Sequence, residues 1–271
     1  MFWVLPLNMK GGNSMQKRFL FIVVIFPILL TTSCRAKSPQ PLINGIGTYY
    51  HFQARTPSQQ TVSIHAVTLN SGRYQARLLT LNQMSTHQSI QDIAAKKQAF
   101  LAINGSFFTP EFEPLGLYIY KGKQESRFIV NRLLTSLVFI DQQGKLTLHT
   151  SLIRSTSPKP ISAHYAFQCG PTLIRRGLIS VYNNSQRAAQ RTILAQARDD
   201  KLVVMVTSPV SLYDLAFIMQ NNPQWFGVDK FIRVVNLDGG TSTAMSLHSG
   251  KAHFVLQNLK GVKYLVLFRV C

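Results

Sequence analysis

The chain has only 10 acidic residues among 271, so few carboxylates are available for chemistry. One of them, Asp238, lies in the stretch VVNLDGGTSTAMSL at residues 234–247. A carboxylate in such a loop could attack a carbon atom, activate water or stabilise a positive charge. An Asp-Gly pair is an ordinary turn signal, but two glycines followed by Thr241, Ser242 and Thr243 exceed what a two-residue turn needs. We therefore predict that Asp238 is catalytic; the alternative is that it caps the glycine turn.

Two predicted strands end in similar chemistry, because each delivers an asparagine that is followed by glycine. Residues 99–103 lead into Asn104-Gly105, and residues 230–235 lead into Asn236. An asparagine amide both donates and accepts hydrogen bonds, which suits sugar hydroxyls and phosphate oxygens. Consecutive glycine and hydroxyl residues can form an anion-binding nest of N–H groups, although either loop alone could be only a hairpin turn. The predicted substrate-binding residues are Asn104, Gly105, Thr192, Asn236, Gly239, Gly240, Thr241 and Ser242.

A third segment, QRTILAQAR, places Arg191 and Thr192 at the start of an alternating pattern that is typical of a strand. A guanidinium there could hold a phosphate through two parallel hydrogen bonds, so Arg191 is the second predicted catalytic residue. A lone arginine in a basic chain could also be an ordinary surface residue. Glu111 and Glu113 lie in the loop that follows Asn104 and are candidates for a second carboxylate or for plain loop charges.

The elements that must position these residues are mostly strands. Serine N-caps and helical spacing predict helices at residues 89–98 and 211–222. Hairpin turns are predicted at residues 71–72, 142–144 and 199–200. Short connections favour antiparallel pairing, so we predict an α+β domain with a mixed, largely antiparallel sheet and a few flanking helices.

The order of these motifs resembles the phosphodiester glycosidase family, which includes the lysosomal uncovering enzyme. The matching motifs are an Asn-Gly-x-Phe-Phe loop at residues 104–108, Pro-x-Gly at 114–116, Gly-Pro at 170–171, Arg-Thr at 191–192 and, at 236–243, the signature Asn-x-Asp-Gly-Gly followed by three small residues. The resemblance spans about residues 61–271. Ser106 and Thr241 stand where the family has glycine, which puts the substrate preference in doubt.

The resemblance implies a hydrolase that cleaves the glycosidic bond between a sugar and a phosphodiester. A phosphodiester leaves as a stable anion, so the site must mainly stabilise the phosphate and an oxocarbenium-like sugar. In that scheme Arg191 serves the phosphate and Asp238 acts at the anomeric carbon. Asn104 and Asn236 orient sugar hydroxyls, and residues 239–241 donate backbone N–H groups. The alternative is a protein that binds an anionic glycan or cell-envelope polymer without cleaving it.

The charge balance also points to an anionic partner. The chain carries 29 Lys plus Arg against 10 Asp plus Glu, a net charge of +19. Such a chain attracts sugar-phosphates, acidic glycans, lipid headgroups or nucleic acid, or simply has a solvated basic surface. No nucleic-acid-binding motif is present in the sequence, so a nucleic-acid partner is not expected. Zinc-type spacings of His and Cys are absent from the sequence, so neither a catalytic metal nor another cofactor is expected, while a structural cation near Asp238 is left open. The oligomeric state is left open.

The first 34 residues are predicted to be a targeting segment. After Met15, which could be the true start, two basic residues precede an apolar run that is shorter than a membrane span. The sequence TTSC resembles a bacterial lipobox and makes Cys34 a candidate for lipidation. We expect export to the periplasm or anchoring of the protein in the membrane through Cys34, a tether at residues 35–47 and one domain at residues 48–271.

Export would place the remaining two cysteines in an oxidising compartment. Cys169 and Cys271 could pair there as a disulfide. They could equally remain free thiols, because the sequence does not show their separation in space.

Overall fold

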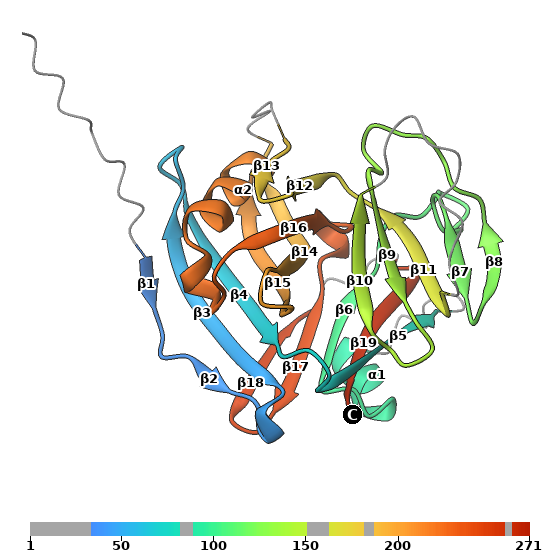
Figure 1. The fold of residues 1–271 in the computed structure, drawn as a ribbon, viewed down its shortest axis with the longest axis horizontal. Helices are drawn as coiled ribbons and strands as arrows, with labels where there is room; N and C mark the ends of the chain where they lie inside the picture. Colours follow the sequence, from blue (N-terminus) through green and yellow to red (C-terminus); the bar gives the residue numbers. More distant parts are fainter. Residues whose placement is uncertain (1–33, 82–88, 151–162, 182–186, 258–261) are drawn as a thin grey trace, which may run out of the picture. The chain divides into compact units, whose positions relative to one another are not determined.

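The computed structural model (Figure 1) describes residues 34–81, 89–150, 163–181, 187–257 and 262–271. Its strands form three sheets, and every strand pair described is antiparallel. The predicted α+β class with largely antiparallel pairing is therefore confirmed. The strands are divided among three sheets, however, where one mixed sheet was predicted.

The largest sheet has nine strands. They are β1 (Cys34–Ala36), β2 (Gln40–Pro41), β3 (Gly47–Arg55), β4 (Thr61–Leu69), β12 (Thr172–Arg175), β13 (Leu178–Ile179), β14 (Ala189–Ala197), β15 (Leu202–Val210) and β16 (Phe231–Asn236). The order across the sheet is β1-β3-β4-β15-β14-β16-β12-β13, with β2 also beside β3.

The other two sheets have five strands each. The second sheet contains β7 (Tyr118–Tyr120), β8 (Lys123–Ser126), β9 (Ser136–Ile140), β10 (Leu146–Thr150) and β11 (Tyr165–Cys169), in the order β10-β9-β11-β7-β8. The third contains β5 (Tyr74–Thr80), β6 (Leu101–Asn104), β17 (Met245–Ser249), β18 (Ala252–Leu256) and β19 (Tyr264–Val270), in the order β18-β17-β6-β19-β5.

Two α-helices and three short 3-10 helices complete the described part of the chain. They are α1 (Ile90–Lys96), α2 (Leu212–Asn221), η1 (Ile43–Gly45), η2 (Pro223–Phe226) and η3 (Gly240–Ser242). Both α-helices begin where the serine signals predicted. The Ser89 hydroxyl accepts from the Asp92 N–H at 3.0 Å, and the Ser211 hydroxyl accepts from the Asp214 N–H at 3.1 Å. Each bond satisfies an amide that the first helical turn leaves unpaired.

The predicted hairpin across residues 71–72 does not form. β4 pairs with β3 and β15 in the nine-stranded sheet, whereas β5 pairs with β19 in the third sheet. The turn at Gly72, with φ 73°, thus carries the chain from one sheet to another. The predicted hairpins at residues 142–144 and 199–200 are confirmed as the β9–β10 and β14–β15 connections.

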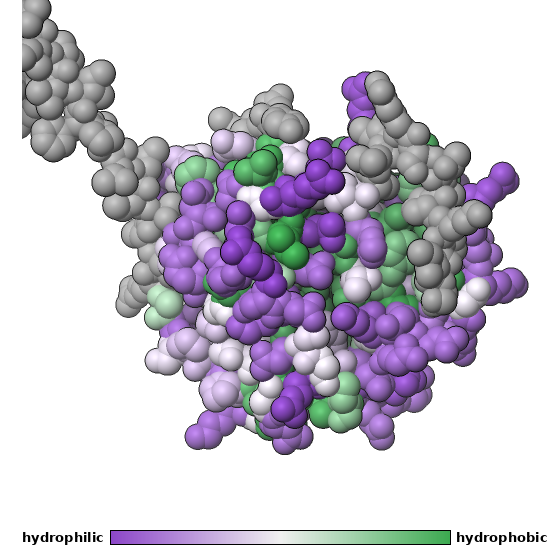
Figure 2. Space-filling model, in the orientation of Figure 1, coloured by the Kyte–Doolittle hydropathy of each residue, from purple (hydrophilic) through white to green (hydrophobic). Residues whose placement is uncertain are grey.

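The central strands of the nine-stranded sheet are buried on both faces. In β14, Leu194 joins a hydrophobic cluster that the three sheets share, whereas Ile193 joins a second cluster that includes Leu215 and Met219 of α2. Side chains alternate between the two faces of a strand, so both faces of β14 contribute to burial. Burying an aliphatic side chain of this size contributes about 1.5–3 kcal/mol. Hydrophilic residues predominate on the surface in Figure 2, with smaller hydrophobic areas between them.

Part of the segment predicted to be a tether belongs to the sheet. β1 and β2 both pair with β3, and the Lys37 N–H donates to the His51 carbonyl at 3.0 Å. Residues 1–33 and the side chain of Cys34, on which the export and lipidation predictions depend, lie outside the described part of the chain. None of the described helices is both long enough and apolar enough to cross a membrane.

The two remaining cysteines do not pair with each other. Cys169 is a free, buried thiol, and Cys271 is free and exposed. Of the two possibilities that the sequence left open, the structure therefore contains free thiols.

Candidate active site

The three predicted loops meet at one place, although they come from two sheets. β6 of the third sheet ends at Asn104, while β16 ends near the start of β14 in the nine-stranded sheet. The Leu237 N–H donates to the Thr192 carbonyl at 2.8 Å, and the Asp238 N–H donates to the Gly105 carbonyl at 3.4 Å. Asp238 therefore lies between a loop of one sheet and the edge of another.

Asn104 holds this junction together. Its side-chain oxygen accepts from the Thr192 hydroxyl at 2.7 Å and from the Ala244 N–H at 3.0 Å. Its amide nitrogen donates to the Gly105 carbonyl at 3.0 Å and to the Asp238 carbonyl at 2.9 Å. The side chain is fully buried, with 0% exposure, and both donors and both acceptor positions are used.

This geometry changes the roles predicted for Asn104 and Thr192. Both were predicted to bind substrate, but each is fully buried, and the Thr192 hydroxyl is committed to Asn104. We infer that the pair positions the loop around Asp238 and does not contact a ligand.

The Asp238 carboxyl is half-buried at the start of the glycine turn. Its Oδ1 accepts from the Gly239 N–H at 2.8 Å. Burial raises the pKa of the Asp238 carboxyl, while hydrogen bonds from the Ser242 side chain and the Gly239 N–H lower it in part. A partly desolvated carboxylate of this kind is suited to act as a base or to stabilise a developing positive charge.

The glycine turn packs tightly against β14. A Cβ atom on Gly239 would lie 2.7 Å from the Gln190 carbonyl oxygen, and Gly240 has a φ of 61°. The Gly239 N–H donates to Asp238 Oδ1, so it is not free to bind an oxyanion, which was the role predicted for it. Gly240 and Thr241 begin η3, and the first N–H groups of a helical turn have no partner within it. These two N–H groups are the ones suited to an anion.

Arg191 lies beside this turn, but part of its guanidinium is already engaged. Its Nε donates to the Val210 carbonyl at 3.0 Å, and Nη2 donates to the Arg187 carbonyl at 2.8 Å. Its Cα is 3.9 Å from the position of a Cβ on Gly239. Burial, and then the charge of Arg187, lower the pKa of Arg191. The guanidinium is thus held in place, and its other N–H groups make no hydrogen bond to a described residue.

Two buried polar atoms of the signature at residues 236–243 have no hydrogen-bonding partner in the described part of the chain. They are Oδ1 of Asn236 and Oγ1 of Thr243. The Asn236 amide nitrogen donates to the Gly170 carbonyl at 3.1 Å and to the Leu237 carbonyl. Because buried polar atoms are ordinarily satisfied, Asn236 Oδ1 and Thr243 Oγ1 stand out as unused, although the surrounding residues enclose both atoms. Thr243 was not among the predicted binding residues, although it is the third hydroxyl residue of the signature.

The candidate second carboxylates stand apart from these contacts. Glu111 and Glu113 are both exposed, and Glu113 Oε2 lies 3.9 Å from the Lys263 ammonium. A hydrogen bond from the Thr109 side chain lowers the pKa of Glu111. Among the described residues, no hydrogen bond or ion pair joins either glutamate to Asp238. The described part of the chain also contains no group of three or more His, Cys, Asp or Glu residues that could hold a metal ion.

Comparisons with known proteins concern the family and the fold of this chain. The sequence model of the phosphodiester glycosidase family matches residues 97–264, which include all three loops. No curated protein sequence was found to match the chain.

Several solved structures have a similar fold. The catalytic domain of zebrafish N-acetylglucosamine-1-phosphodiester α-N-acetylglucosaminidase, auto-inhibited by its pro-peptide, matches with a TM-score of 0.60 at 14% identity, over 89% of this chain and 88% of that one. A hypothetical protein from Synechocystis matches with a TM-score of 0.60 at 16% identity, over 88% of this chain and 64% of that one. A candidate exported protein from Burkholderia pseudomallei matches with a TM-score of 0.52 at 11% identity, over 78% and 74%. At these identities the likeness concerns the fold.

Proposed function

Because the chain belongs to the phosphodiester glycosidase family, we propose that it hydrolyses the glycosidic bond between a sugar and a phosphodiester. The observation that carries the proposal is the half-buried Asp238 carboxyl, held on a glycine turn beside Arg191. Few other acids in the chain are available for this chemistry, since there are only 10 in all.

The proposed reaction breaks the bond between the anomeric carbon and the phosphate oxygen. The bonding electrons stay on the phosphate oxygen, so the leaving group departs as a phosphomonoester anion and needs no proton from a strong acid. Arg191 and the N–H groups of Gly240 and Thr241 stabilise the negative charge that develops on the phosphate. Asp238 stabilises the oxocarbenium-like carbon, attacks it or takes a proton from the water that adds there. A sugar hydroxyl can bond to Asn236 Oδ1 or Thr243 Oγ1 once the residues that enclose these two unused atoms move aside.

The direct test is a panel of methyl phosphodiesters of glucose-, mannose- and N-acetylglucosamine-1-phosphate, followed by ³¹P NMR. Hydrolysis in ¹⁸O-water should place the label on the sugar, because the C–O bond breaks. Label on phosphate would indicate a phosphodiesterase and overturn the proposal, as would the absence of turnover on every member.

The matched variants are Asp238→Asn and Asp229→Asn. Asp229 is an exposed acid that pairs with Arg198 at 3.8 Å, so its replacement should leave activity unchanged. Asp238→Asn should lower kcat by at least about 10³-fold without loss of the fold. If Asp238 merely caps the glycine turn, the melting temperature should fall together with the activity.

The competing function is the binding of an anionic glycan or cell-envelope polymer without hydrolysis. The net charge of +19 and the free N–H groups of the turn would serve such a binder as well. The two functions differ in one outcome: a binder should retain sugar-phosphate ligands intact after prolonged incubation.

We also propose that the protein is exported and anchored through Cys34, as the first 34 residues suggest. Expression of the full chain in a bacterium, followed by mass spectrometry, should show a lipid-modified Cys34 at the new N-terminus. A Cys34→Ala variant that stays membrane-bound and unprocessed to the same extent as the wild type would contradict lipidation but leave the proposed hydrolysis untouched.

A further inference from the structure

A cavity of about 430 Å³ lies at the opposite end of β14 from the candidate active site. Gln196 lines it, five residues after Arg191 on the same strand, which is a distance of about 17 Å. The three sheets meet here, because the lining comes from β5, β10, β14 and the turns beside them. Its volume falls within the range of small-molecule sites, which is about 300–1,000 Å³.

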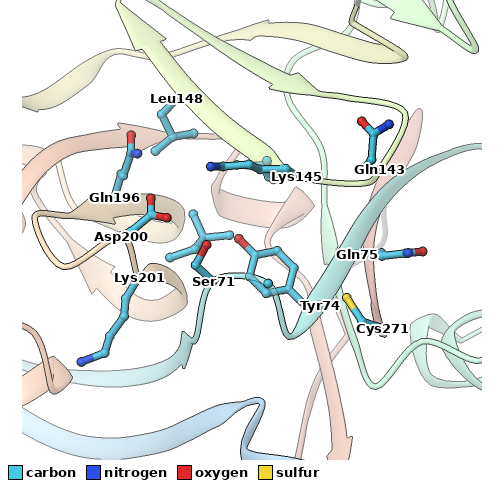
Figure 3. Close-up of a pocket in the computed structure, with 13 residues that line it drawn as sticks. Ser71, Tyr74, Gln75, Gln143, Lys145, Leu148, Gln196, Asp200, Lys201 and Cys271 are labelled. Atoms are coloured by element: carbon cyan, nitrogen blue, oxygen red, sulfur yellow. The ribbon is translucent and has the colours of Figure 1, made fainter.

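Several polar side chains of this cavity make no hydrogen bond within the described part of the chain. The Tyr74 ring is buried, with 9% exposure, yet its hydroxyl makes no hydrogen bond to any described residue. The same holds for the Asp200 carboxylate, the Lys145 ammonium and the amide of Gln143, all of which line the cavity. Figure 3 shows the Tyr74 hydroxyl, the Asp200 carboxylate and the Lys145 ammonium directed into a common space.

The charges in the cavity do not favour an anion, although the chain as a whole is strongly basic. Lys145 faces Asp200, so one positive and one negative group are directed into the space. Lys201 is paired with Asp199 at 2.7 Å, donates to the Gly227 carbonyl at 3.1 Å and points away in Figure 3. Anion sites in proteins gather cations or N–H groups without a facing carboxylate. An uncharged polar ligand fits this lining better.

The donors and acceptors match those of a hydroxyl-rich ligand. Amide side chains and hydroxyl groups both donate and accept, as sugar hydroxyls do. Burial is the main cause that raises the pKa of the Tyr74 phenol, so the group keeps its proton and can donate. Leu146, Leu148 and Leu202 supply apolar surface for the C–H face of a ring.

The walls of the cavity are held in place by contacts between sheets. The Ala76 N–H donates to the Gly144 carbonyl at 2.8 Å, which fixes the β9–β10 turn against β5. Arg233 of β16 donates to the Leu148 carbonyl and, at 3.4 Å, to the Gln196 side chain. The cavity is thus preformed, which lowers the ordering cost of binding.

From this geometry we propose a second, non-catalytic site that binds an uncharged saccharide unit between β5, β10 and the β14–β15 turn. The site is separate from Asp238 and does not depend on hydrolysis at the other end of the strand. On a polymeric glycan it would hold a unit remote from the bond that is cleaved.

Cys271 provides a local reporter, because its free, exposed thiol lines the cavity. The experiment is iodoacetamide alkylation of the full chain, read peptide by peptide by mass spectrometry. The probes are glucose, N-acetylglucosamine, maltotriose and chitotriose, with inorganic phosphate and glucose-1-phosphate as anionic probes. Cys169 is buried with a strongly raised thiol pKa and serves as the unreactive reference.

At least one neutral saccharide should slow alkylation of Cys271 several-fold, while the anions should not. Tyr74→Phe and Asp200→Asn should each raise the saccharide concentration needed for protection by about tenfold, the usual effect of one lost hydrogen bond to a ligand. The matched controls Tyr120→Phe and Asp229→Asn lie outside the cavity and should leave protection unchanged. The melting temperature of each variant confirms that it is folded.

Three outcomes would overturn the proposal. The first is that no saccharide protects Cys271, and the second is that only the anions do. The third is that protection in the Tyr74→Phe/Asp200→Asn double variant equals that of the wild type. None of these outcomes bears on the proposed hydrolysis, which is measured separately with the Asp238 variant.

Discussion

Replacing Asn104 by alanine should weaken the fold and the active site together. The change removes four hydrogen bonds of 2.7–3.0 Å from a side chain with 0% exposure. Each such bond contributes about 0.5–1.5 kcal/mol net, so the free energy of unfolding should fall by about 2–6 kcal/mol. Thr192→Val removes only one of the four bonds and should cost about 1 kcal/mol.

The assay is urea unfolding at equilibrium, with the slope of the transition compared between variants. Asn70→Ala is the matched control, because Asn70 makes one exposed hydrogen bond, to the Gly45 carbonyl at 2.8 Å. The free energy of unfolding of Asn70→Ala should stay within about 0.5 kcal/mol of the wild-type value. For activity, loss of positioning should appear as a lower kcat of Asn104→Ala.

Two results would refute this reasoning. If Asn104→Ala costs no more stability than Thr192→Val, the four bonds do not act as the structure indicates. If kcat is unchanged and only KM rises, Asn104 contacts the ligand and the original prediction of a substrate-binding residue is correct.

Four further predictions concern the turn and its neighbours. Because burial raises the pKa of Asp238, the acid limb of kcat/KM should lie above the ordinary aspartate pKa, and a limb at or below it would contradict the assignment. By linkage, a raised carboxyl pKa favours the folded state at low pH, and this contribution is lost as the pH rises through the folded-state pKa. At neutral pH the buried carboxylate therefore costs stability, and Asp238→Asn should be at least as stable as the wild type in thermal unfolding. Gly239→Ala should lower the free energy of unfolding by about 3 kcal/mol, since its Cβ would lie 2.7 Å from the Gln190 carbonyl oxygen. Gly240→Ala, at φ 61° in open space, should lower it by about 1 kcal/mol. Equal losses for the two variants in urea unfolding would rule out the clash. Arg191→Lys keeps the charge but loses the planar fork, so kcat/KM should fall by about tenfold to a hundredfold, and an unchanged value would exclude Arg191 from phosphate binding.

The β4–β5 connection shows where local signals stop being informative. A Ser-Gly turn between two alternating segments predicts a hairpin, because the signal describes only how the chain bends. Which strand β5 joins depends on its fit against β19, whose residues 264–270 lie far along the chain. The same limit explains why one sheet was predicted and three are present.

Asn104 illustrates the corresponding limit for the site. An asparagine at the end of a strand has the same sequence signature whether its amide faces a ligand or is consumed by neighbouring backbone groups. Only the packing of β6 against β14 and β16 reveals that Thr192, Ala244, Gly105 and Asp238 use all of its hydrogen-bonding positions.

The sequence by itself determined the local features and the candidates for chemistry. Serine caps define the starts of the two helices, and a glycine at 239 allows the backbone to approach the Gln190 carbonyl closely. The scarcity of acids singles out Asp238. Each of these features depends on neighbouring residues or on composition alone. Tertiary structure decided which groups meet. It brought loops from two sheets around Asp238 and placed an unused Tyr74 hydroxyl in a cavity where three sheets join, since such contacts depend on long-range strand pairing that no local pattern specifies.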